Sequence, residues 1–414
     1  MTGPSLDLSR HVRAGDTVMW GQACAEPAVL TRELMRQRHA IGPITCFTGL
    51  PLSDSVSAEF ADIVTFVSYC GGGRYASMVE GETFHALVTR YSDLPDVLDP
   101  DVVLVLVSPA DDDGWHGLAM ADEYLSASLD TARVVIAQVC DRLPAGSGGT
   151  RIHTSRLAAV VDGGDGLVSP PPAREPSAAD RAIARQVHDL VEDGSTIQVG
   201  LGALPDLILS ALADHADLGI HSGVVTDSVL ALVRCGAVTN ARKRRDRGVS
   251  VAGMVLGSPE LAEFAHHGFV ALRPTSYTHD REVLASLPRF VAVNSALEVD
   301  LTGQVNAETA GGRYLGAVGG AGDFLAGARL SRGGLPIVAL PSTARGRSRI
   351  VSSLDGPVST SRSEVGLVVT EWGVADLRGL TLRQRQRAML GVAHPDHREE
   401  LQRAALSGRP EGAR

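Results

Sequence analysis

The sequence predicts an α/β protein built from two layered domains with mainly parallel sheets. Short, continuous runs of valine, isoleucine and leucine alternate with stretches of helical periodicity, which is typical of strands buried on both faces and joined by helices. The chain has 414 residues, more than one hydrophobic core usually organises. A proline cluster near the middle interrupts the apolar periodicity, and we place the junction between the domains there.

The predicted elements fall on both sides of this cluster. Before it, apolar runs lie at 102–108 and 132–139, and a helical pattern covers 26–35. The cluster spans 168–180 and is expected to be extended. After it comes a helical pattern around 181–191, followed by apolar runs at 195–200, 218–220, 290–299, 335–340 and 365–370. The predicted domains are therefore 1–172 and 173–406, with a frayed tail at 407–414.

Composition limits the function classes that the chain can serve. Hydrophobic residues make up 44% and charged residues 21% of the chain, as in soluble globular proteins. A net charge of -10 disfavours nucleic acid or an anionic membrane as a partner. The apolar run at 101–108 is far too short to cross a bilayer. The first ten residues lack the apolar core of a secretory signal, so we expect a cytoplasmic protein.

Cysteine and lysine usage exclude further chemistry. The 5 cysteines are odd in number and never form a Cys-x-x-Cys pair, which disfavours a disulfide framework and a structural zinc site. We expect reduced thiols and no metal. Lys243 is the sole lysine beside many arginines, a bias that suggests a GC-rich bacterial genome. Schiff-base catalysis would have to use Lys243 itself.

Two glycine clusters are candidate ligand loops. The first, at 198–205, puts Gly200 and Gly202 between a predicted strand and a helix, where backbone N–H groups and the helix dipole favour a phosphate or an oxyanion. A tight turn that needs glycine for steric reasons explains the same pattern. The second, at 316–324, allows close backbone approach to a ligand. Its glycine order is not that of a dinucleotide site, and a flexible loop remains the alternative.

Polar residues at 294–306 form a third candidate. Glu298, Asp300 and Asn306 surround a strand end and a Thr-Gly turn. They could contact a ligand, or they could be solvated turn residues. The basic run at 242–247 has two similar interpretations, a solvated loop or a partner for a nucleotide phosphate.

Taken together and in this order, several segments resemble the acetyl-CoA hydrolase/transferase family, which includes 4-hydroxybutyrate and butyrate CoA-transferases. The resemblance extends over nearly the whole chain. The segments are Gly-Gln-Ala-Cys-Ala-Glu-Pro at 21–27, Gln-Val-Gly-Leu-Gly-Ala-Leu-Pro at 198–205, Leu-Gly-Ile-His-Ser-Gly at 218–223, the stretch 294–306, Gly-Gly at 319–320 with Asp-Phe at 323–324, Val-Thr-Glu-Trp-Gly-Val-Ala-Asp-Leu-Arg at 369–378 and Ala-His-Pro-Asp at 393–396.

The resemblance implies two domains of NagB/RpiA-like, CoA-transferase topology with the active site in the cleft between them. In such enzymes a glutamate attacks the acyl-CoA and forms a glutamyl-CoA thioester, helped by backbone donors and by remote CoA binding energy. Asn306 and Gly319 become candidates for oxyanion stabilisation. The resemblance also suggests a homo-oligomer, since family members commonly are. The residues that would line CoA are Gly200, Leu201, Gly202, Ala203, Leu204, Glu298, Gly320 and Ala321.

One departure from the family pattern decides the expected mechanism. Where the family has His-Ser/Thr-Glu-Met, this chain has His221-Ser222-Gly223-Val224. Glycine has no side chain and cannot form a thioester, so the nucleophilic carboxylate is expected to be missing. Ala321 also stands where many relatives have glutamine, which suggests an altered substrate pocket.

Three hypotheses follow for the function. The first is an acyl-CoA-dependent enzyme that transfers the acyl group directly to an amine, a hydroxyl or water, with His221 or Ser222 assisting; for His221 a packed strand residue is an equal interpretation. Cys24 could supply a thiol, although a small core residue is the simpler interpretation. The second is a conventional CoA-transferase or hydrolase that uses another carboxylate, such as Glu298 or Glu26. The third is a non-catalytic protein that binds acyl-CoA.

Overall fold

The computed structural model describes residues 6–80, 83–164, 166–172 and 174–407. The chain divides into two compact units: unit 1 comprises Met1–Pro171, Gly223–Asp227 and Ser250–Thr278, and unit 2 comprises Pro172–Ser222, Ser228–Val249 and His279–Arg414. The domain boundaries expected from the sequence, 1–172 and 173–406, stay predictions. Two segments of the expected second domain group with unit 1. In the predicted tail, Ser407 ends a helix and 408–414 lie outside the described residues.

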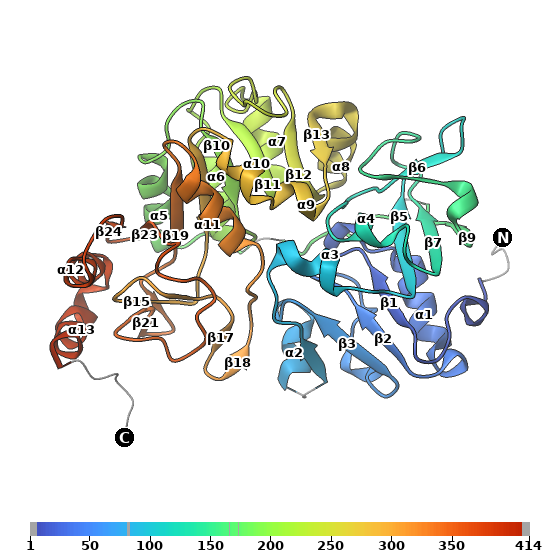
Figure 1. Cartoon of the computed structure of the whole chain (residues 1–414), viewed down its shortest axis with the longest axis horizontal. Helices are drawn as coiled ribbons and strands as arrows, with labels where there is room; N and C mark the ends of the chain where they lie inside the picture. The colour runs from blue at the N-terminus through green and yellow to red at the C-terminus, as the bar shows by residue number, and fades with distance from the viewer. Residues whose placement is uncertain (1–5, 81–82, 165, 173, 408–414) are drawn as a thin grey trace. The chain divides into compact units, whose positions relative to one another are not determined.

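A parallel sheet forms the centre of unit 1. Its strand order is β4-β3-β2-β1-β5-β7-β9, and every neighbouring pair is parallel. The strands are β1 (Thr17–Trp20), β2 (Ile44–Phe47), β3 (Val64–Ser68), β4 (Phe84–Ala86), β5 (Val102–Val107), β7 (Val134–Val139) and β9 (Ala159–Asp162). The helices are α1 (Ala28–Ile41), α2 (Tyr75–Glu80), α3 (Leu94–Val97) and α4 (Leu125–Ser128). Figure 1 shows β1, β2 and β3 side by side in blue, with α1 beside them.

Both faces of this sheet are buried, as its uninterrupted apolar strands predict. Alternate residues such as Val18 and Trp20 point into one core together with Leu30 and Leu34 of α1. The residue between them, Met19, is equally buried but lies on the other face. A sheet covered on both sides needs apolar residues at every strand position, which explains the continuous runs in the sequence.

The rest of unit 1 contains a small antiparallel strand pair and the segment 250–278. Strand β6 (Trp115–Gly117) pairs antiparallel with β8 (Arg151–His153). The segment 250–278 contributes β12 (Ser250–Val255), α8 (Pro259–Phe264), β13 (Val270–Leu272) and α9 (Thr275–Thr278), with β12 and β13 parallel. Isolated bridges join Ala121 to Met254 and Glu123 to Pro274, so the loop 118–123 is held against β12 and the start of α9.

Unit 2 is also built on a sheet of mainly parallel strands. Strand β11 (Gly219–Val225) is followed in the sheet order by β10 (Thr196–Val199), β14 (Phe290–Asn294), β19 (Leu335–Ala339), β23 (Leu367–Thr370) and β24 (Gly373–Asp376). Only the last pair, β23 with β24, is antiparallel among these. The small strands are β15 (Glu298–Asp300), β16 (Val305–Asn306), β17 (Thr309–Ala310), β18 (Arg313–Tyr314), β20 (Thr343–Ala344), β21 (Arg347–Ser348) and β22 (Ile350–Val351). The mixed α/β fold with mainly parallel sheets is therefore confirmed.

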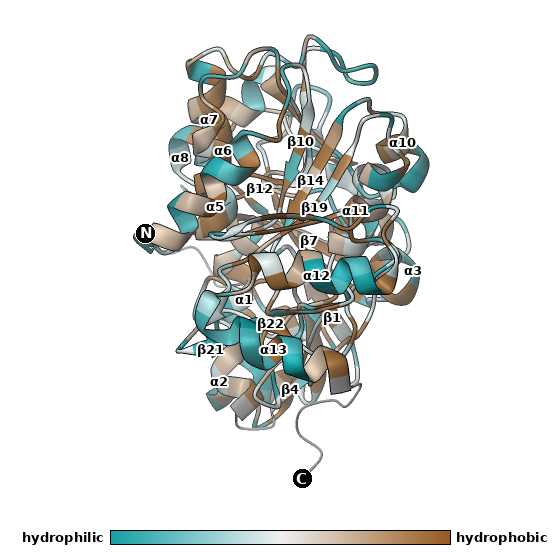
Figure 2. Ribbon diagram, turned by 90° about the vertical axis from the view of Figure 1, so that its left-hand side faces the viewer, coloured by the Kyte–Doolittle hydropathy of each residue, from teal (hydrophilic) through white to brown (hydrophobic). Residues whose placement is uncertain are grey.

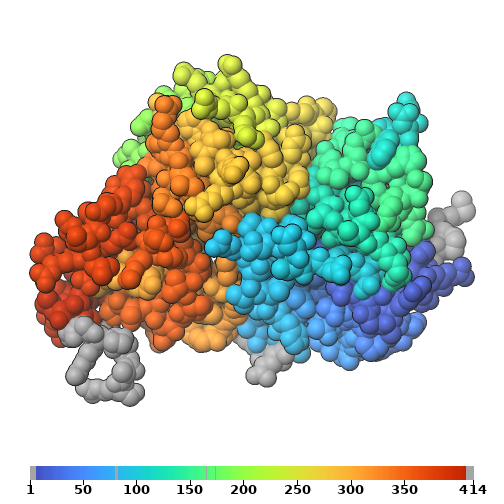
Figure 3. All heavy atoms as spheres, viewed as in Figure 1, coloured from blue at the N-terminus to red at the C-terminus, as the bar shows by residue number. Residues whose placement is uncertain are grey.

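The helices of unit 2 are α5 (Ala178–His188), α6 (Ala203–Ala211), α7 (Asp227–Arg234), α10 (Arg281–Ala285), α11 (Ala321–Leu330), α12 (Leu382–Val392) and α13 (Pro395–Ser407). Helices α11 and α12 join Phe290 and Val338 in one core. Capping boxes begin α5 at Ser177 and α12 at Thr381. Figure 2 shows the brown, apolar strands β14 and β19 and hydrophilic residues on α12 and α13, and Figure 3 shows these last helices, in red, on the surface. None of the helices in the described part of the chain is long and apolar enough to span a bilayer.

Several expected elements differ from the structure in extent. The run at 218–220 overlaps the longer strand β11, and the helix expected around 181–191 is α5, which starts and ends earlier. The apolar run 290–299 is not one strand: β14 ends at Asn294 and β15 starts at Glu298. The Arg349 guanidinium donates hydrogen bonds to the carbonyl oxygens of Ala296 and Leu297, which holds the turn between the strands. The helix expected at 26–35 starts later and continues to Ile41, where Gly42 with a φ of 99° ends it.

The two units share one topological feature. In unit 1 the chain moves from β1 outward through β2 to β4, and then returns to add β5 on the other side of β1. In unit 2 it moves from β10 to β11 and then returns to add β14 on the other side of β10. Open α/β sheets bind ligands beyond the carboxyl ends of the strands at such a reversal. The residues that follow β1 and β10 are therefore the first places to look for a site.

Candidate functional site

The loop after β10 carries the first set of predicted CoA-binding residues. Gly200, Leu201 and Gly202 join β10 to α6, whose first residues are Ala203 and Leu204. Gly202 precedes the helix with a φ of 127°, a conformation that a residue with a β-carbon rarely adopts, and no side chain caps the helix. Leu204 is buried, whereas Leu201 is 41% exposed. The free N–H groups and the helix dipole suit an anionic group such as a phosphate.

The predicted catalytic sequence His221-Ser222-Gly223 lies within strand β11. His221 and Ser222 are buried and Gly223 is half-buried. The Ser222 hydroxyl donates to the carbonyl oxygen of Val199, 3.3 Å away, at the carboxyl end of β10. The His221 ring packs edge-on against Phe290, with 6.5 Å between the ring centroids. These contacts give both side chains a structural role within the sheet.

His279 packs against the second glycine loop, at 316–324. A β-carbon on Gly320 would be 2.4 Å from Nε2 of His279, so only glycine fits between this ring and the start of α11. The His279 ring also lies 4.4 Å from Phe324. Burial, with a further contribution from His221, lowers the pKa of His279 to about 3, so its imidazole is neutral. Gly319, with a φ of 57°, and Ala321 flank this contact.

The structure brings Glu298 and Asn306 together. They face each other across the antiparallel pair β15–β16, and the Asn306 amide nitrogen lies 3.5 Å from a Glu298 carboxylate oxygen. The Asn306 side-chain oxygen accepts from the N–H groups of Glu308 and Thr309, each 3.0 Å away, and its amide donates to the Thr309 carbonyl oxygen at 2.8 Å. The amide is thus already used to form a turn.

In unit 1, Gln22 occupies the place that follows β1. Its side-chain oxygen accepts from the Leu50 N–H at 2.9 Å and from the Tyr69 hydroxyl at 2.8 Å. These two donors fix the amide orientation, so the amide nitrogen points the other way, where it donates to the Tyr91 hydroxyl at 2.8 Å. A β-carbon on Gly49 would lie 1.9 Å from the Gln22 oxygen, so glycine is required there.

The second hydrogen bond of this amide goes to Glu123. The Gln22 nitrogen lies 2.6 Å from Oε2 of Glu123, a residue that is 2% exposed and has a φ of 42°. The other carboxyl oxygen, Oε1, has no hydrogen-bond partner among the described residues. Burial raises the pKa of Glu123 to about 8, and the Gln22 hydrogen bond opposes that rise. Buried polar atoms are usually paired, so this oxygen keeps an unused capacity to accept a hydrogen bond.

Glu123 lies beside the position where the resemblance puts the family's nucleophile. A β-carbon on Gly253, in β12, would be 3.1 Å from the Gly223 carbonyl oxygen and 3.3 Å from Cγ of Glu123. The Gly253 carbonyl oxygen also accepts from the Asp122 N–H at 2.9 Å. Glycine at 253 therefore leaves open a space that both the Glu123 side chain and the Gly223 carbonyl oxygen border.

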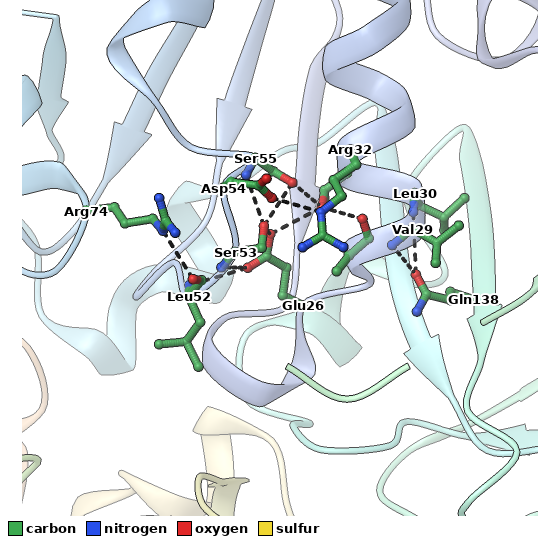
Figure 4. A network of polar contacts seen from close by, with 12 residues as sticks. Glu26, Val29, Leu30, Arg32, Leu52, Ser53, Asp54, Ser55, Arg74 and Gln138 are labelled. Carbon is green, nitrogen blue, oxygen red and sulfur yellow. Dashed lines mark hydrogen bonds and ion pairs between the residues drawn. The ribbon is translucent and has the colours of Figure 1, made fainter. Parts of the chain in front are cut away.

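The other buried glutamate near this edge, Glu26, has a different environment (Figure 4). Its carboxylate accepts from the Ser53 N–H at 3.0 Å, the Leu52 N–H at 3.4 Å and the Thr31 hydroxyl at 3.2 Å, and also from the Ser53 hydroxyl. Both oxygens are used in these contacts. Glu26 therefore ties the loop 52–55 to the start of α1.

Sequence reasoning missed Glu123, Gln22 and His279. Gln22 belongs to the segment that carried the resemblance, so its place in that segment was a usable signal. Glu123 and His279 stand in stretches without a motif, and nothing in the sequence reports a left-handed backbone or an unpaired oxygen. Cys24, considered as a thiol, is buried, and burial raises its pKa to about 11, so it stays protonated.

Two other features lie apart from these residues. A pocket at the opposite edge of the unit 2 sheet is lined by residues at the amino ends of strands, among them Ser195, Arg289, Leu335 and Leu367; ligands of such sheets bind at the carboxyl ends. Among the described residues, His188, Asp214 and His215 form one group whose ligand atoms lie within 4.8 Å of one another. Asp214 already contacts the ring nitrogens of both histidines, at 3.0 and 3.5 Å.

Comparisons with known proteins agree with the resemblance seen in the sequence. Residues 257–405 match the family described as the acetyl-CoA hydrolase/transferase C-terminal domain. The chain is 38% identical over 309 residues to the 4-hydroxybutyrate coenzyme A transferase of Clostridium kluyveri, covering 73% of this chain and 72% of that protein. It is 31% identical over 412 residues to the butyryl-CoA:acetate CoA-transferase of Anaerostipes caccae, covering 94% and 92%. The crystal structure of RipA from Yersinia pestis superposes with a TM-score of 0.92 at 31% identity, covering 98% of this chain and 97% of RipA.

Proposed function

Because the chain belongs to the acetyl-CoA hydrolase/transferase family, we propose that it transfers the acyl group of an acyl-CoA directly to a small acceptor, without a glutamyl-CoA intermediate. The chain is an acyl-CoA transferase/hydrolase-like enzyme whose substrate is a CoA thioester. What is specific to this proposal is the direct transfer.

The observation that carries the proposal is the glycine at position 223. Strand β11 passes through this position with no side chain to attack a thioester. Covalent catalysis tolerates little displacement of the nucleophile. Glu26, one of the two carboxylates considered as a substitute, is committed to a hydrogen-bond network, and the other, Glu298, shares its environment with Asn306 and Arg349.

In this proposal, unit 2 holds the CoA thioester. Residues Gly200 to Leu204 bind a phosphate or the pantetheine arm at the start of α6, and Gly320 and Ala321 line the cofactor at the start of α11. Glu298 contacts the cofactor, and backbone N–H groups near Gly319 stabilise the oxyanion that forms when the carbonyl is attacked. Asn306 forms hydrogen bonds that fix the turn beside Glu298. The neutral His279 ring packs against Gly320.

His221 and Ser222 take supporting parts in the proposal. They lie next to Gly223 and their contacts anchor β11 to neighbouring strands. We assign them the positioning of the strand that carries Gly223. A NagB/RpiA-like topology for both units belongs to the same proposal, supported by the strand-order reversal that each sheet contains.

The test follows the release of free CoA thiol from a panel of acyl-CoAs. The protein is incubated with each acyl-CoA alone, with an amine, with an alcohol and with acetate. Thiol release that requires an amine or an alcohol is the expected result. Thiol release in water alone would also fit a conventional hydrolase, and it supports direct transfer only if trapping with hydroxylamine or borohydride detects no glutamyl thioester. Conversion of the acyl-CoA and acetate into acetyl-CoA, which releases no free thiol and is followed by chromatography of the CoA esters, would support a conventional CoA-transferase. Tight binding with neither thiol release nor a new CoA ester would support a binding protein. Either result would overturn the proposal.

A further inference from the structure

We propose that Glu123 is the general base of this enzyme and that its acceptor substrate is an uncharged nucleophile: an alcohol, a neutral amine or water. The inference rests on the proposed function, because it assumes that an acyl-CoA is attacked near residue 223. It adds a catalytic residue in a part of the chain that carries no recognised motif, and a substrate class.

The position of Glu123 supports this role. Glu123 lies at the carboxyl edge of the unit 1 sheet, where the Gln22 amide that follows β1 holds one of its oxygens. A β-carbon on Gly253 would lie 3.3 Å from the Glu123 Cγ and 3.1 Å from the Gly223 carbonyl oxygen. Glu123 and the residue that lacks a carboxyl group therefore border the same space, which glycine at 253 leaves open.

The Glu123 side chain is also held in a fixed orientation. A φ of 42° is unfavourable for a glutamate, and such conformations persist only where the surroundings enforce them. Here the Asp122 N–H bonds the Gly253 carbonyl oxygen and the Thr275 N–H bonds the Glu123 carbonyl oxygen at 3.1 Å. The backbone is thus fixed on both sides, and Oε2 is fixed by Gln22, which leaves Oε1 as the one free acceptor of the group.

The charges of the groups near Glu123 bear on which acceptor the site favours. The ionisable groups that interact with Glu123 among the described residues are Tyr69 and Tyr124. Burial raises the pKa of both phenols well above 10, so they remain neutral. The Gln22 amide that binds the carboxyl is also uncharged. Burial and the uncharged Gln22 amide are what shift the pKa of Glu123. A carboxylate acceptor would therefore bring a second negative charge next to a buried carboxylate that is held by uncharged groups. The site therefore favours an uncharged acceptor.

The proposed step balances as follows. The ionised Glu123 carboxylate takes the proton of the acceptor X–H while X attacks the thioester carbonyl carbon, so that an X–C bond forms. The tetrahedral oxyanion collapses, the C–S bond breaks, and CoA leaves as the thiolate. Glu123 returns its proton to that sulfur, which releases free CoA thiol and regenerates the carboxylate. No oxidant, reductant or covalent enzyme intermediate is needed.

The test compares Glu123→Gln with Glu26→Gln in the full chain. For the wild type, kcat/KM with an alcohol acceptor, which does not titrate in this range, is expected to rise with pH and to level off above about 8. Glu123→Gln should lower kcat by about 10²- to 10⁴-fold, the usual contribution of a general base, and should remove this inflection. The affinity for CoA should not change. Glu26→Gln should keep the inflection, since that carboxylate is used in structural hydrogen bonds.

Three outcomes would overturn the inference. One is a Glu123→Gln variant that binds CoA and retains the wild-type pH profile. Another is covalent labelling of Glu123 during turnover, which would make it a nucleophile. The third is a preference for acetate over alcohols and amines. If Glu123→Gln fails to fold, Glu123→Ala with added formate replaces it, and recovery of activity with formate is then required. Absence of thiol release from every acyl-CoA by the wild type would instead refute the proposed function itself.

Discussion

Two buried glutamates at the same edge of the unit 1 sheet show how environment separates a structural carboxyl from a reactive one. Glu26 is surrounded by N–H and hydroxyl donors that use both of its oxygens. Glu123 receives one hydrogen bond, from Gln22, and its second oxygen has no partner among the described residues. Burial alone therefore does not distinguish these two carboxyls, whereas the number of hydrogen bonds that each one accepts does.

The largest effect on stability is expected from Glu26. Glu26→Ala removes the acceptor for the N–H groups of Leu52 and Ser53, whereas the Thr31 hydroxyl keeps the Ser55 hydroxyl as a partner. An orphaned buried donor costs about 1–3 kcal/mol, so the free energy of unfolding should fall by about 3–5 kcal/mol. Urea denaturation monitored by circular dichroism measures this change. A loss below about 1 kcal/mol would show that the network contributes little.

Glu123 should instead make stability depend on pH. Its pKa is about 8 in the folded chain against an ordinary 4.5, so between these pH values the folded state keeps a proton that the unfolded state has lost. The free energy of unfolding should therefore decrease as pH rises, by about 1.4 kcal/mol per pH unit at most. The contribution is complete below the unfolded pKa and is lost above the folded pKa.

Glu123→Gln isolates this effect, because glutamine does not titrate. The difference in unfolding free energy between Glu123→Gln and the wild type should shift in favour of the variant from pH 5 to pH 9, by up to about 4 kcal/mol. Denaturation curves at several pH values measure it. A difference that stays constant with pH would mean that the Glu123 carboxyl titrates normally in the folded protein.

Gly49 offers a way to disturb Gln22 without touching Glu123. A β-carbon at 49 would collide with the Gln22 oxygen, and overpacking of this kind costs about 1–3 kcal/mol. Gly49→Ala should also move the Gln22 amide away from Glu123 and raise the pH at which activity levels off. Gly391→Ala is the matched control, because a β-carbon there meets no atom within 4 Å. Equal thermal shifts for the two variants would contradict the assigned packing.

The smallest effect is expected at Cys24. Burial keeps its thiol protonated, with a pKa near 11, and its one hydrogen bond, to the Gly257 carbonyl oxygen, is long at 3.9 Å. Cys24→Ala should leave kcat within about twofold and change stability by about 1 kcal/mol. A loss of activity as large as that of Glu123→Gln would make this thiol the catalytic group.

Sequence patterns predicted the sheets better than the site. Runs such as 102–108 lie in strands because a sheet covered on both faces leaves no position for a polar residue. The motif at 369–378 also has a structural basis, since the Glu371 carboxylate binds the Ser342 N–H at 2.8 Å and Thr370 binds the Val392 carbonyl oxygen at 2.7 Å. The break between β14 and β15 depends on Arg349, far along the chain. Such long-range contacts leave no local pattern in the sequence.

Some residues of the candidate site could likewise be predicted from local sequence patterns, and others could not. The glycine loop at 200–202 was recognisable because helix starts and glycine spacing are local features. Glu123 and Gly223 both lie next to Gly253 of β12, although the three residues are far apart in the sequence. The role of Glu123 depends on which oxygen remains unpaired, and that follows from the fold as a whole.

The most direct measurement is trapping during turnover. The protein is incubated with an acyl-CoA and an uncharged acceptor, quenched with hydroxylamine or borohydride at successive times, and digested for mass spectrometry. The account predicts steady release of CoA with no modified glutamate at any time. A hydroxamate or a reduced side chain at Glu123, Glu26 or Glu298, accumulating during turnover, would contradict direct transfer and establish a covalent intermediate.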